Sequence, residues 1–219
     1  MTVTVHRTVV STRQGMADTL ALNPHPKFIQ LFREQFGFTE EEFESALRCF
    51  RVLDIPKKGH YLRAGDISNA KAYLNKGCAR CYVLDEKGHE RIVSLAFEDW
   101  WLGDFGSYYS GEPGSTFIQM LEDSQLLVIS KESFQKLEND VPKLREWYAT
   151  KVRRRADALT KQLQERGTLS AQDRYLNLIK AQPEIFQRVD LQYIAGYLNI
   201  EPQSLSRMRK RLAEKRASS

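Results

Sequence analysis

The hydrophobic periodicity of this 219-residue chain changes at two points, which limits the folds that it can adopt. Between Arg51 and Ser130, apolar residues alternate with polar ones or form short runs, and Gly-containing turns interrupt them. Many short strands at this spacing indicate a small antiparallel barrel or jelly roll. On either side of this region, apolar residues recur every three or four positions, which predicts helices. The expected fold class is therefore α+β, with a β-barrel placed before a run of helices.

Two helices are expected before the barrel. The first ~25 residues should be irregular, because Asn23-Pro24-His25-Pro26 blocks a helix, and the first helix should begin near His25 or Lys27. Thr39, with Glu42 three residues later, predicts the cap of the second helix. The apolar face of that second helix should comprise Phe43, Ala46, Leu47 and Phe50.

Two strand pairs can be placed inside the barrel. Lys87-Gly88 should close a hairpin between residues 81–85 and 91–97. Residues 116–121 and 125–129 should form a last pair of strands.

A long helix is predicted after the barrel, because Pro142 suits a first helical turn. It carries a single narrow apolar stripe, interrupted by one charge: Leu144, Tyr148, Val152, Arg155, Leu159 and Leu163. Such a helix needs a partner. It could pack on its own barrel or pair with the same helix of a second subunit, and the narrow stripe favours the pair.

The C-terminal region predicts a helix-turn-helix. Gly167 to Ser170 should form a hinge, with Ser170 capping the next helix. Asp190 can cap a short helix, Asn199 suits a left-handed turn, and Pro202 suits the start of the last helix. Two short helices joined in this way form the motif that places its second helix in the major groove of DNA.

The last helix has an apolar face formed by Leu205, Met208 and Leu212, and its other faces carry polar and basic groups. Gln203 can pair with adenine, and Arg207 can pair bidentately with guanine. Residues further along the helix are expected to contact phosphates. The candidate DNA-contacting residues are Gln203, Ser204, Ser206, Arg207, Arg209, Lys210 and Arg211.

Charge is distributed as expected when one half of a protein meets a polyanion. The formal net charge is +5. From Lys143 onward there are 17 basic and 8 acidic residues, whereas the preceding residues hold 16 basic and 20 acidic ones. The basic excess therefore lies in the half that carries the helix-turn-helix.

Other function classes find little support. Cys78 and Cys81 are spaced C-x-x-C but lie at the start of a predicted strand, without a second such pair, so structural thiols are expected. No nucleophile and acid stand together, so we expect no enzyme. Because the chain has no long apolar run and no apolar signal at its start, a cytoplasmic protein without membrane contact is expected.

From about Phe28 to Lys215 the chain resembles the cyclic-AMP receptor protein/FNR (Crp/Fnr) family of bacterial transcription regulators. Asp190–Leu212 is similar to the family's helix-turn-helix, and its Leu-Ser-Arg core looks like the form found in Bacteroidetes. The family's base-reading Arg-Glu-x-x-x-Arg falls on Pro202, Gln203 and Arg207. Only the last Arg is retained, so the resemblance implies a different target sequence.

The barrel resembles the family's cyclic-nucleotide-binding fold. Lys58–Asp66 is similar to its opening, and Trp101–Phe105 lies where members carry the Gly-Glu-Leu of the phosphate cassette. Pro113–Phe117 lies where an Arg-Ser or Arg-Thr clamps the cyclic phosphate, but Gly114 stands at the position of that Arg. Losing this charge-assisted contact argues against cyclic AMP, and the pocket could bind another small molecule or none. The resemblance implies effector-pocket residues Gly103, Asp104, Phe105, Ser115 and Thr116.

No cofactor is expected. The iron–sulfur type of sensor needs an N-terminal cysteine cluster, and residues 1–48 contain no cysteine. His60 and His89 lie in the barrel, but nothing marks them as haem ligands. The nearby aromatic residues are expected to pack in core and loops: Trp100, Trp101, Phe105, Tyr108 and Tyr109.

The resemblance implies a homodimer in which two recognition helices, one DNA turn apart, read a near-palindrome. It divides the chain into a sensor barrel (1–140), a dimerisation helix (141–166) and a winged helix-turn-helix (167–219), with the wing at Phe186–Val189. Double-stranded DNA would be the partner, with RNA polymerase added for an activator. The alternative is a nucleotide-sensing regulatory module that binds no DNA and acts on a protein partner.

Overall fold

The structure is a computed structural model and describes residues 23–217. The predicted irregular start lies almost entirely outside these described residues. The strands are β1 (Phe50–Ile55), β2 (His60–Leu62), β3 (Ala70–Lys76), β4 (Ala79–Leu84), β5 (Glu90–Ala96), β6 (Trp100–Leu102), β7 (Phe117–Met120) and β8 (Ser124–Ser130). The helices are α1 (Pro26–Gln30), the π-helix η2 (Leu31–Gln35), α2 (Glu40–Leu47), α3 (Phe105–Ser110), α4 (Lys131–Asp140), α5 (Pro142–Thr168), α6 (Ala171–Ala181), α7 (Ile185–Arg188), α8 (Leu191–Leu198) and α9 (Pro202–Ala217).

The strands form two four-stranded sheets, ordered β1-β8-β3-β6 and β2-β7-β4-β5, and every pairing is antiparallel. Side chains from both sheets meet in one buried cluster that includes Leu74, Leu126, Ile118 and Met120. Each strand buries one face in this core, which explains the period-two pattern of the sequence. The jelly-roll architecture predicted from that pattern is confirmed.

One of the two predicted strand pairs is correct. β4 and β5 form the expected hairpin, and Gly88 adopts the positive φ of 79° that its turn requires. The prediction that residues 116–121 and 125–129 pair with each other is wrong. β7 pairs with β2 and β4, whereas β8 pairs with β1 and β3, because the intervening turn carries the chain from one sheet to the other. An alternating pattern gives the buried face of a strand but not its neighbour, so the sequence could not distinguish the two arrangements.

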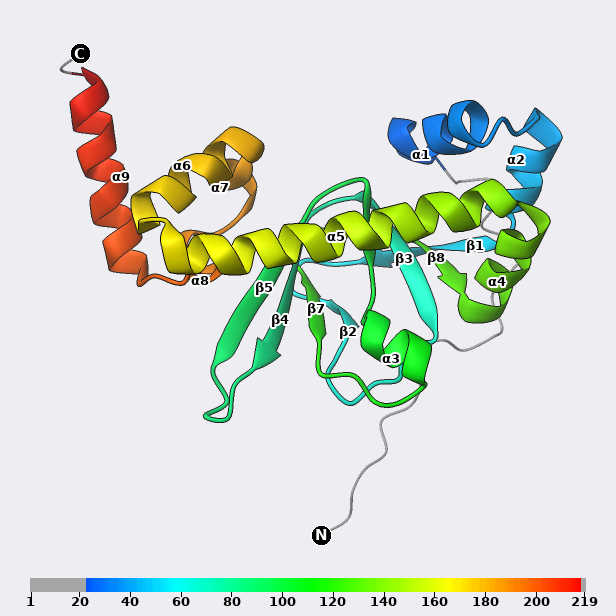
Figure 1. The fold of residues 1–219 in the computed structure, drawn as a ribbon, viewed down its shortest axis with the longest axis horizontal. Helices are drawn as coiled ribbons and strands as arrows, with labels where there is room; N and C mark the ends of the chain where they lie inside the picture. Colours follow the sequence, from blue (N-terminus) through cyan, green and yellow to red (C-terminus); the bar gives the residue numbers. More distant parts are fainter. Residues whose placement is uncertain (1–22, 218–219) are drawn as a thin grey trace, which may run out of the picture.

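The N-terminal helices cover the sheet that contains β1 (Figure 1). The predicted capping box is present: Glu42 N donates to Thr39 Oγ1 at 3.3 Å, and Thr39 N donates to Glu42 Oε2 at 2.8 Å. Phe43 and Ala46 are buried, as expected for the inner face of α2. Phe50, which was assigned to the same helix face, instead begins β1.

α5 runs across the molecule from the N-terminal helices to the C-terminal ones (Figure 1). Pro142 is its first residue, as predicted. Leu144 and Tyr148 are buried against the barrel, but further along Val152 is 36% and Leu163 is 67% exposed. The first turns of the stripe thus pack on the protein's own barrel, and the later part has apolar groups facing solvent.

The C-terminal helices follow the predicted order with two corrections. Ser170 caps α6, and Asn199 has the predicted left-handed conformation, with φ 54°. Asp190 precedes α8 but its side chain makes no capping hydrogen bond.

The second correction concerns the wing. Phe186–Val189 is not a strand, since α7 spans Ile185–Arg188, and no strand follows Ser130 among residues 131–217. A helical turn places Ile185 and Val189, four residues apart, on the same side, and both are buried. The apolar residues that suggested a strand therefore belong to a helical turn on the core.

Candidate nucleic-acid interface

Two arginine side chains hydrogen-bond the backbone just before the turn between α8 and α9. Arg174 Nη2 donates to Leu198 O at 3.1 Å, and Arg174 Nη1 donates to Leu169 O at 2.7 Å. Arg166, near the end of α5, reaches Tyr197 O at 3.5 Å. These cations bind the last carbonyls of α8, where the helix dipole favours positive charge. The end of α8 is thereby tied to the hinge segment.

α9 turns its apolar face inward. Leu205 is 0% and Met208 is 6% exposed, and both pack against residues of α6 and α8. The predicted DNA-contacting side chains lie on the remaining faces, and all are exposed except Ser204, which is partly buried. The exposed positions are Gln203, Ser206, Arg207, Arg209, Lys210 and Arg211.

One surface of α9 gathers most of these groups. Ser204, Arg207, Lys210 and Arg211 line a shallow hollow together with Glu214. Arg207 Nη2 lies 3.5 Å from Ser204 Oγ. Gln203, Ser206 and Arg209 do not line this hollow, and the Arg209 guanidinium stacks over the Phe186 ring at 4.3 Å. Arg209 thus flanks the surface of α9 that holds Arg207 and Lys210.

The helix-turn-helix shares a hydrophobic core with the barrel, which sequence reasoning missed. Cys78, Tyr82 and Ile92 of the barrel belong to the same buried cluster as Ile194 and Leu198 of α8. α8 lies against β5, and a Cβ on Gly196 would stand 3.3 Å from Ile92 Cγ1. The absence of a side chain at Gly196 thus permits the close approach of α8 to the hairpin.

Charged groups reinforce this docking. Arg80 is 4% exposed, and its guanidinium lies between the rings of Tyr82 and Tyr193, at 4.2 and 4.4 Å. Arg188 of α7 forms ion pairs with Glu98 and Glu122 of the barrel. Burial alone would raise the pKa of Glu98, but hydrogen bonds from Arg188 and from the backbone N–H of Gly77 lower it to about 2.

The residues predicted for the effector pocket are only partly brought together. Asp104 caps α3, with Ser107 N donating to its Oδ1 at 3.1 Å and Thr116 N donating to its Oδ2 at 3.2 Å. Phe105 instead contributes to a groove beside α5, which is also lined by Trp101, Tyr148 and Val152. Asp104, Ser115 and Thr116 therefore form one cluster, and Phe105 belongs to another.

A cyclic nucleotide, the ligand of the fold implied by the sequence, does not fit this cluster. Its phosphate needs free N–H donors and a cation, whereas here a carboxylate already accepts the N–H of Thr116. A side chain at position 114 would also collide with Asp104, since a Cβ there would lie 2.6 Å from Asp104 Oδ2. The missing side chain at Gly114 thus leaves the space that the Asp104 carboxylate fills.

The predicted aromatic cluster is mainly core, and it includes a buried cation that the sequence did not predict. Trp101 packs against Tyr73, Phe134 and Tyr148, whereas Tyr109 is 61% exposed. Lys71 of β3 is 2% exposed. Its Nζ lies 3.6 to 4.5 Å from the ring centres of three residues, Tyr108, Phe134 and Tyr148. The cation therefore joins the barrel, α3, α4 and α5.

The cysteines and histidines of the barrel have packing roles. Cys78 and Cys81 are buried, and burial raises the pKa of Cys78 to about 12. His60 Nε2 lies 3.1 Å from Tyr82 Oη, and His89 contacts Asp85 in the β4–β5 turn. Residues 23–217 contain no group of three potential metal ligands among His, Cys, Asp and Glu.

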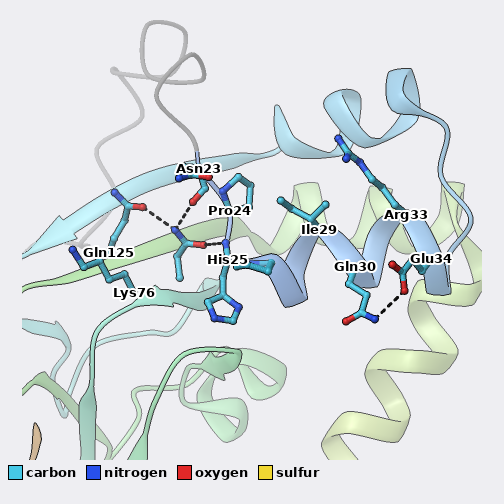
Figure 2. Close-up of a pocket in the computed structure, with 11 residues that line it drawn as sticks. Asn23, Pro24, His25, Ile29, Gln30, Arg33, Glu34, Lys76 and Gln125 are labelled. Atoms are coloured by element: carbon cyan, nitrogen blue, oxygen red, sulfur yellow. Dashed lines mark hydrogen bonds between the residues drawn. The ribbon is translucent and has the colours of Figure 1, made fainter. Parts of the chain in front are cut away.

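In a groove beside α1, the side chain of Asn75 hydrogen-bonds other groups of the groove lining (Figure 2). His25 N donates to Asn75 Oδ1 at 2.6 Å, and Asn75 Nδ2 donates to Asn23 O at 3.1 Å and Gln125 Oε1 at 2.8 Å. Asn75 therefore fastens the start of α1 to the sheet, and we assign no ligand to this groove.

A jelly roll, a long helix and a helix-turn-helix docked on the barrel make up the described residues. Residues 54–140 match the family of cyclic nucleotide-binding domains. No curated protein matches the sequence significantly. Within residues 23–217, no helix is both long and apolar enough to cross a membrane.

Solved structures share the fold of most of the chain. The c-di-GMP responsive global regulator CLP of Xanthomonas campestris is 16% identical with a TM-score of 0.65, covering 79% of this chain and 91% of CLP. The catabolite activator protein of Thermus thermophilus is 21% identical with a TM-score of 0.53, covering 84% of this chain and 87% of that protein. CooA of Carboxydothermus hydrogenoformans is 18% identical with a TM-score of 0.65, covering 85% and 84%.

The resemblance to the Crp/Fnr family is thereby confirmed in the domain match and the fold. The prediction that the chain is no enzyme agrees with these structures, which include a global regulator and a catabolite activator protein. The Bacteroidetes form remains a resemblance of one segment, Leu205-Ser206-Arg207.

Proposed function

We propose that this chain is a sequence-specific DNA-binding transcription regulator that acts as a homodimer. The main support for this proposal is that α9 has one buried apolar face and one exposed polar and basic face. Leu205 and Met208 are buried, while Gln203, Arg207 and Lys210 are exposed at the start and middle of the same helix. The N-terminal part of a recognition helix is the part that reaches base edges in the major groove.

The roles of the side chains follow from their positions. Arg207 reads guanine and Gln203 reads adenine, while Ser204 and Ser206 contact a base or a phosphate. Lys210, Arg211 and the flanking Arg209 bind phosphates, and this contribution is independent of sequence.

The long helix supports the dimer. Val152 and Leu163 are exposed apolar residues on the stripe of α5, and Val152 also lines the groove that contains Trp101 and Phe105. A second α5 packed along this stripe would cover both features. We propose residues 1–140 as the sensor, 141–166 as the dimerisation helix and 167–219 as the DNA-binding domain.

Selection of bound sequences from random DNA duplexes tests this function. The expected result is enrichment of a near-palindrome whose half-sites lie about 10 bp apart, one turn of DNA. Enrichment of no sequence, combined with capture of duplexes no better than by an Arg207→Ala/Lys210→Ala variant, would contradict the proposal and favour a module that acts on a protein partner.

A further inference from the structure

The carboxylate of Asp104 lies at the meeting point of two chain segments. Ser107 N donates to Oδ1 from the first turn of α3, and Thr116 N donates to Oδ2 from the segment before β7. The backbone N–H of Ser115 and the side chain of Thr116 also bond this carboxylate. The Asp104 carboxylate thus accepts hydrogen bonds from both the first turn of α3 and the 113–117 segment.

Gly114 lies so close to this carboxylate that a side chain at position 114 would collide with it. A Cβ at position 114 would lie 2.6 Å from Asp104 Oδ2 and 2.9 Å from Asp104 Cγ, closer than real Cβ contacts. The carboxylate cannot easily move aside, because its hydrogen bonds hold both oxygens. Any larger residue at position 114 would therefore displace Asp104.

The 113–117 segment is also held from its other side. Gly114 N donates to Asp66 O at 3.0 Å, and Gly65 N donates to Gly114 O at 2.8 Å. Burial alone would raise the pKa of Asp104, but the donors from Ser107, Thr116 and Ser115 lower it. Asp104 is therefore an ionised group at neutral pH, and its partners favour that charge.

We infer that Asp104 is a built-in anion that occupies the phosphate-binding segment of this domain, so that the barrel keeps this segment in place without a cyclic nucleotide. A nucleotide phosphate would have to take the same N–H donors and lie beside a like charge. The domain match therefore does not imply a bound cyclic nucleotide in this chain, because the Asp104 carboxylate already accepts the N–H of Thr116 beside Gly114. The inference concerns the barrel alone and does not depend on DNA binding by α9.

The first test measures thermal unfolding of the full chain with and without cyclic AMP, cyclic GMP or inorganic phosphate at millimolar concentration. The wild type should not respond. Asp104→Ala should lower Tm by about 2–6 °C, because a helix cap and its donors are lost, and should regain part of that loss in phosphate. Asp104→Asn keeps the shape of the side chain without its charge and should respond less than Asp104→Ala. Equal responses of wild type and Asp104→Ala, including none in both, would overturn the inference, as would stabilisation of the wild type by micromolar cyclic nucleotide.

The second test is a double-mutant cycle between positions 104 and 114. Gly114→Ala should lower Tm in the wild type, because the new methyl group displaces the carboxylate. In an Asp104→Ala background the same change should cost much less, since the colliding group is gone. Equal losses in both backgrounds would show that Asp104 does not occupy the place beside Gly114, which overturns the inference independently of any ligand.

Discussion

The guanidinium of Arg188 spans both oxygens of Glu98, with 2.9 Å from Nη1 to Oε2 and 2.7 Å from Nη2 to Oε1. This bidentate pair joins α7, the helix before the helix-turn-helix, to the segment between β5 and β6. Both side chains are about three-quarters buried. The orientation of α9 relative to the barrel therefore depends on a specific contact as well as on the shared apolar core.

The Arg188–Glu98 pair should be energetically coupled. In a double-mutant cycle with Arg188→Met and Glu98→Gln, the coupling energy should be about 1–3 kcal/mol, since bidentate and partly buried pairs are the stronger ones. Denaturant unfolding of the four proteins measures it. The control is the exposed pair of Arg91 and Asp85, which should give no more than about 1 kcal/mol. Equal coupling in the two cycles would contradict the interpretation of Arg188 as an interdomain link.

Lys71 should make stability depend on pH near neutrality. Burial lowers the pKa of Lys71 to about 7 from its ordinary value of 10.5. Above pH 7 the unfolded chain therefore binds more protons at this group than the folded one, so the free energy of unfolding should rise with pH. Relative to Lys71→Met, the rise should approach about 1.4 kcal/mol per pH unit between pH 7 and 8.5.

Urea unfolding at several pH values measures this slope. Lys76→Met, at the exposed end of the same strand, should leave the slope unchanged. The rings of Tyr108, Phe134 and Tyr148 attract the ammonium and oppose the effect of burial. A difference between wild type and Lys71→Met that stays constant over this range would show that the rings outweigh burial and keep the amine protonated.

The stripe on α5 should hold the dimer together. Leu163→Glu places a charge on a residue that is 67% exposed in one chain, so the fold should survive while the dimer dissociates. Sedimentation should show a loss of at least tenfold in dimer affinity, the equivalent of about 1.4 kcal/mol. Gln164→Glu adds the same charge one residue further, about 100° around the helix, and should leave the dimer intact. Similar effects of the two changes would place the interface elsewhere.

Substitutions of Arg207 and Lys210 should affect DNA binding in different ways. Arg207→Ala should reduce discrimination between selected and scrambled sites by about 1–3 kcal/mol, because a bidentate base contact is lost. Lys210→Ala should weaken binding to both sites equally and make it less dependent on salt. Fluorescence anisotropy with two labelled duplexes measures both effects. If both variants lose the same affinity for both duplexes, Arg207 does not read a base.

Local signals predicted the elements that local chemistry determines. The capping box at Thr39 and Glu42, the left-handed Asn199 and the Pro142 and Pro202 helix starts are all present. These features involve residues close in sequence, so their spacing carries the information. The prediction of a wing at Phe186–Val189 was wrong because a short apolar run fits both a strand and a helical turn. Only the burial of Ile185 and Val189 in the structure decides between the two.

Contacts between distant segments could not be predicted in the same way. The pairing of β7 with β4, the position of Glu98 opposite Arg188, and the rings around Lys71 are set by the packing of segments tens of residues apart. For Asp104, the sequence identified Gly114 as a departure from the family pattern. The collision between a side chain at position 114 and the Asp104 carboxylate, which explains the departure, appears only in three dimensions.

DNA binding by the full chain should depend steeply on salt if α9 enters the major groove. With a selected duplex and the wild-type dimer, the logarithm of the affinity should fall linearly with the logarithm of the salt concentration. Six to ten phosphate contacts would cost about a thousand- to a hundred-thousand-fold between 50 and 200 mM salt. Absence of DNA binding at low salt, or an affinity that does not change with salt, would contradict the assignment of α9 as a DNA-reading helix.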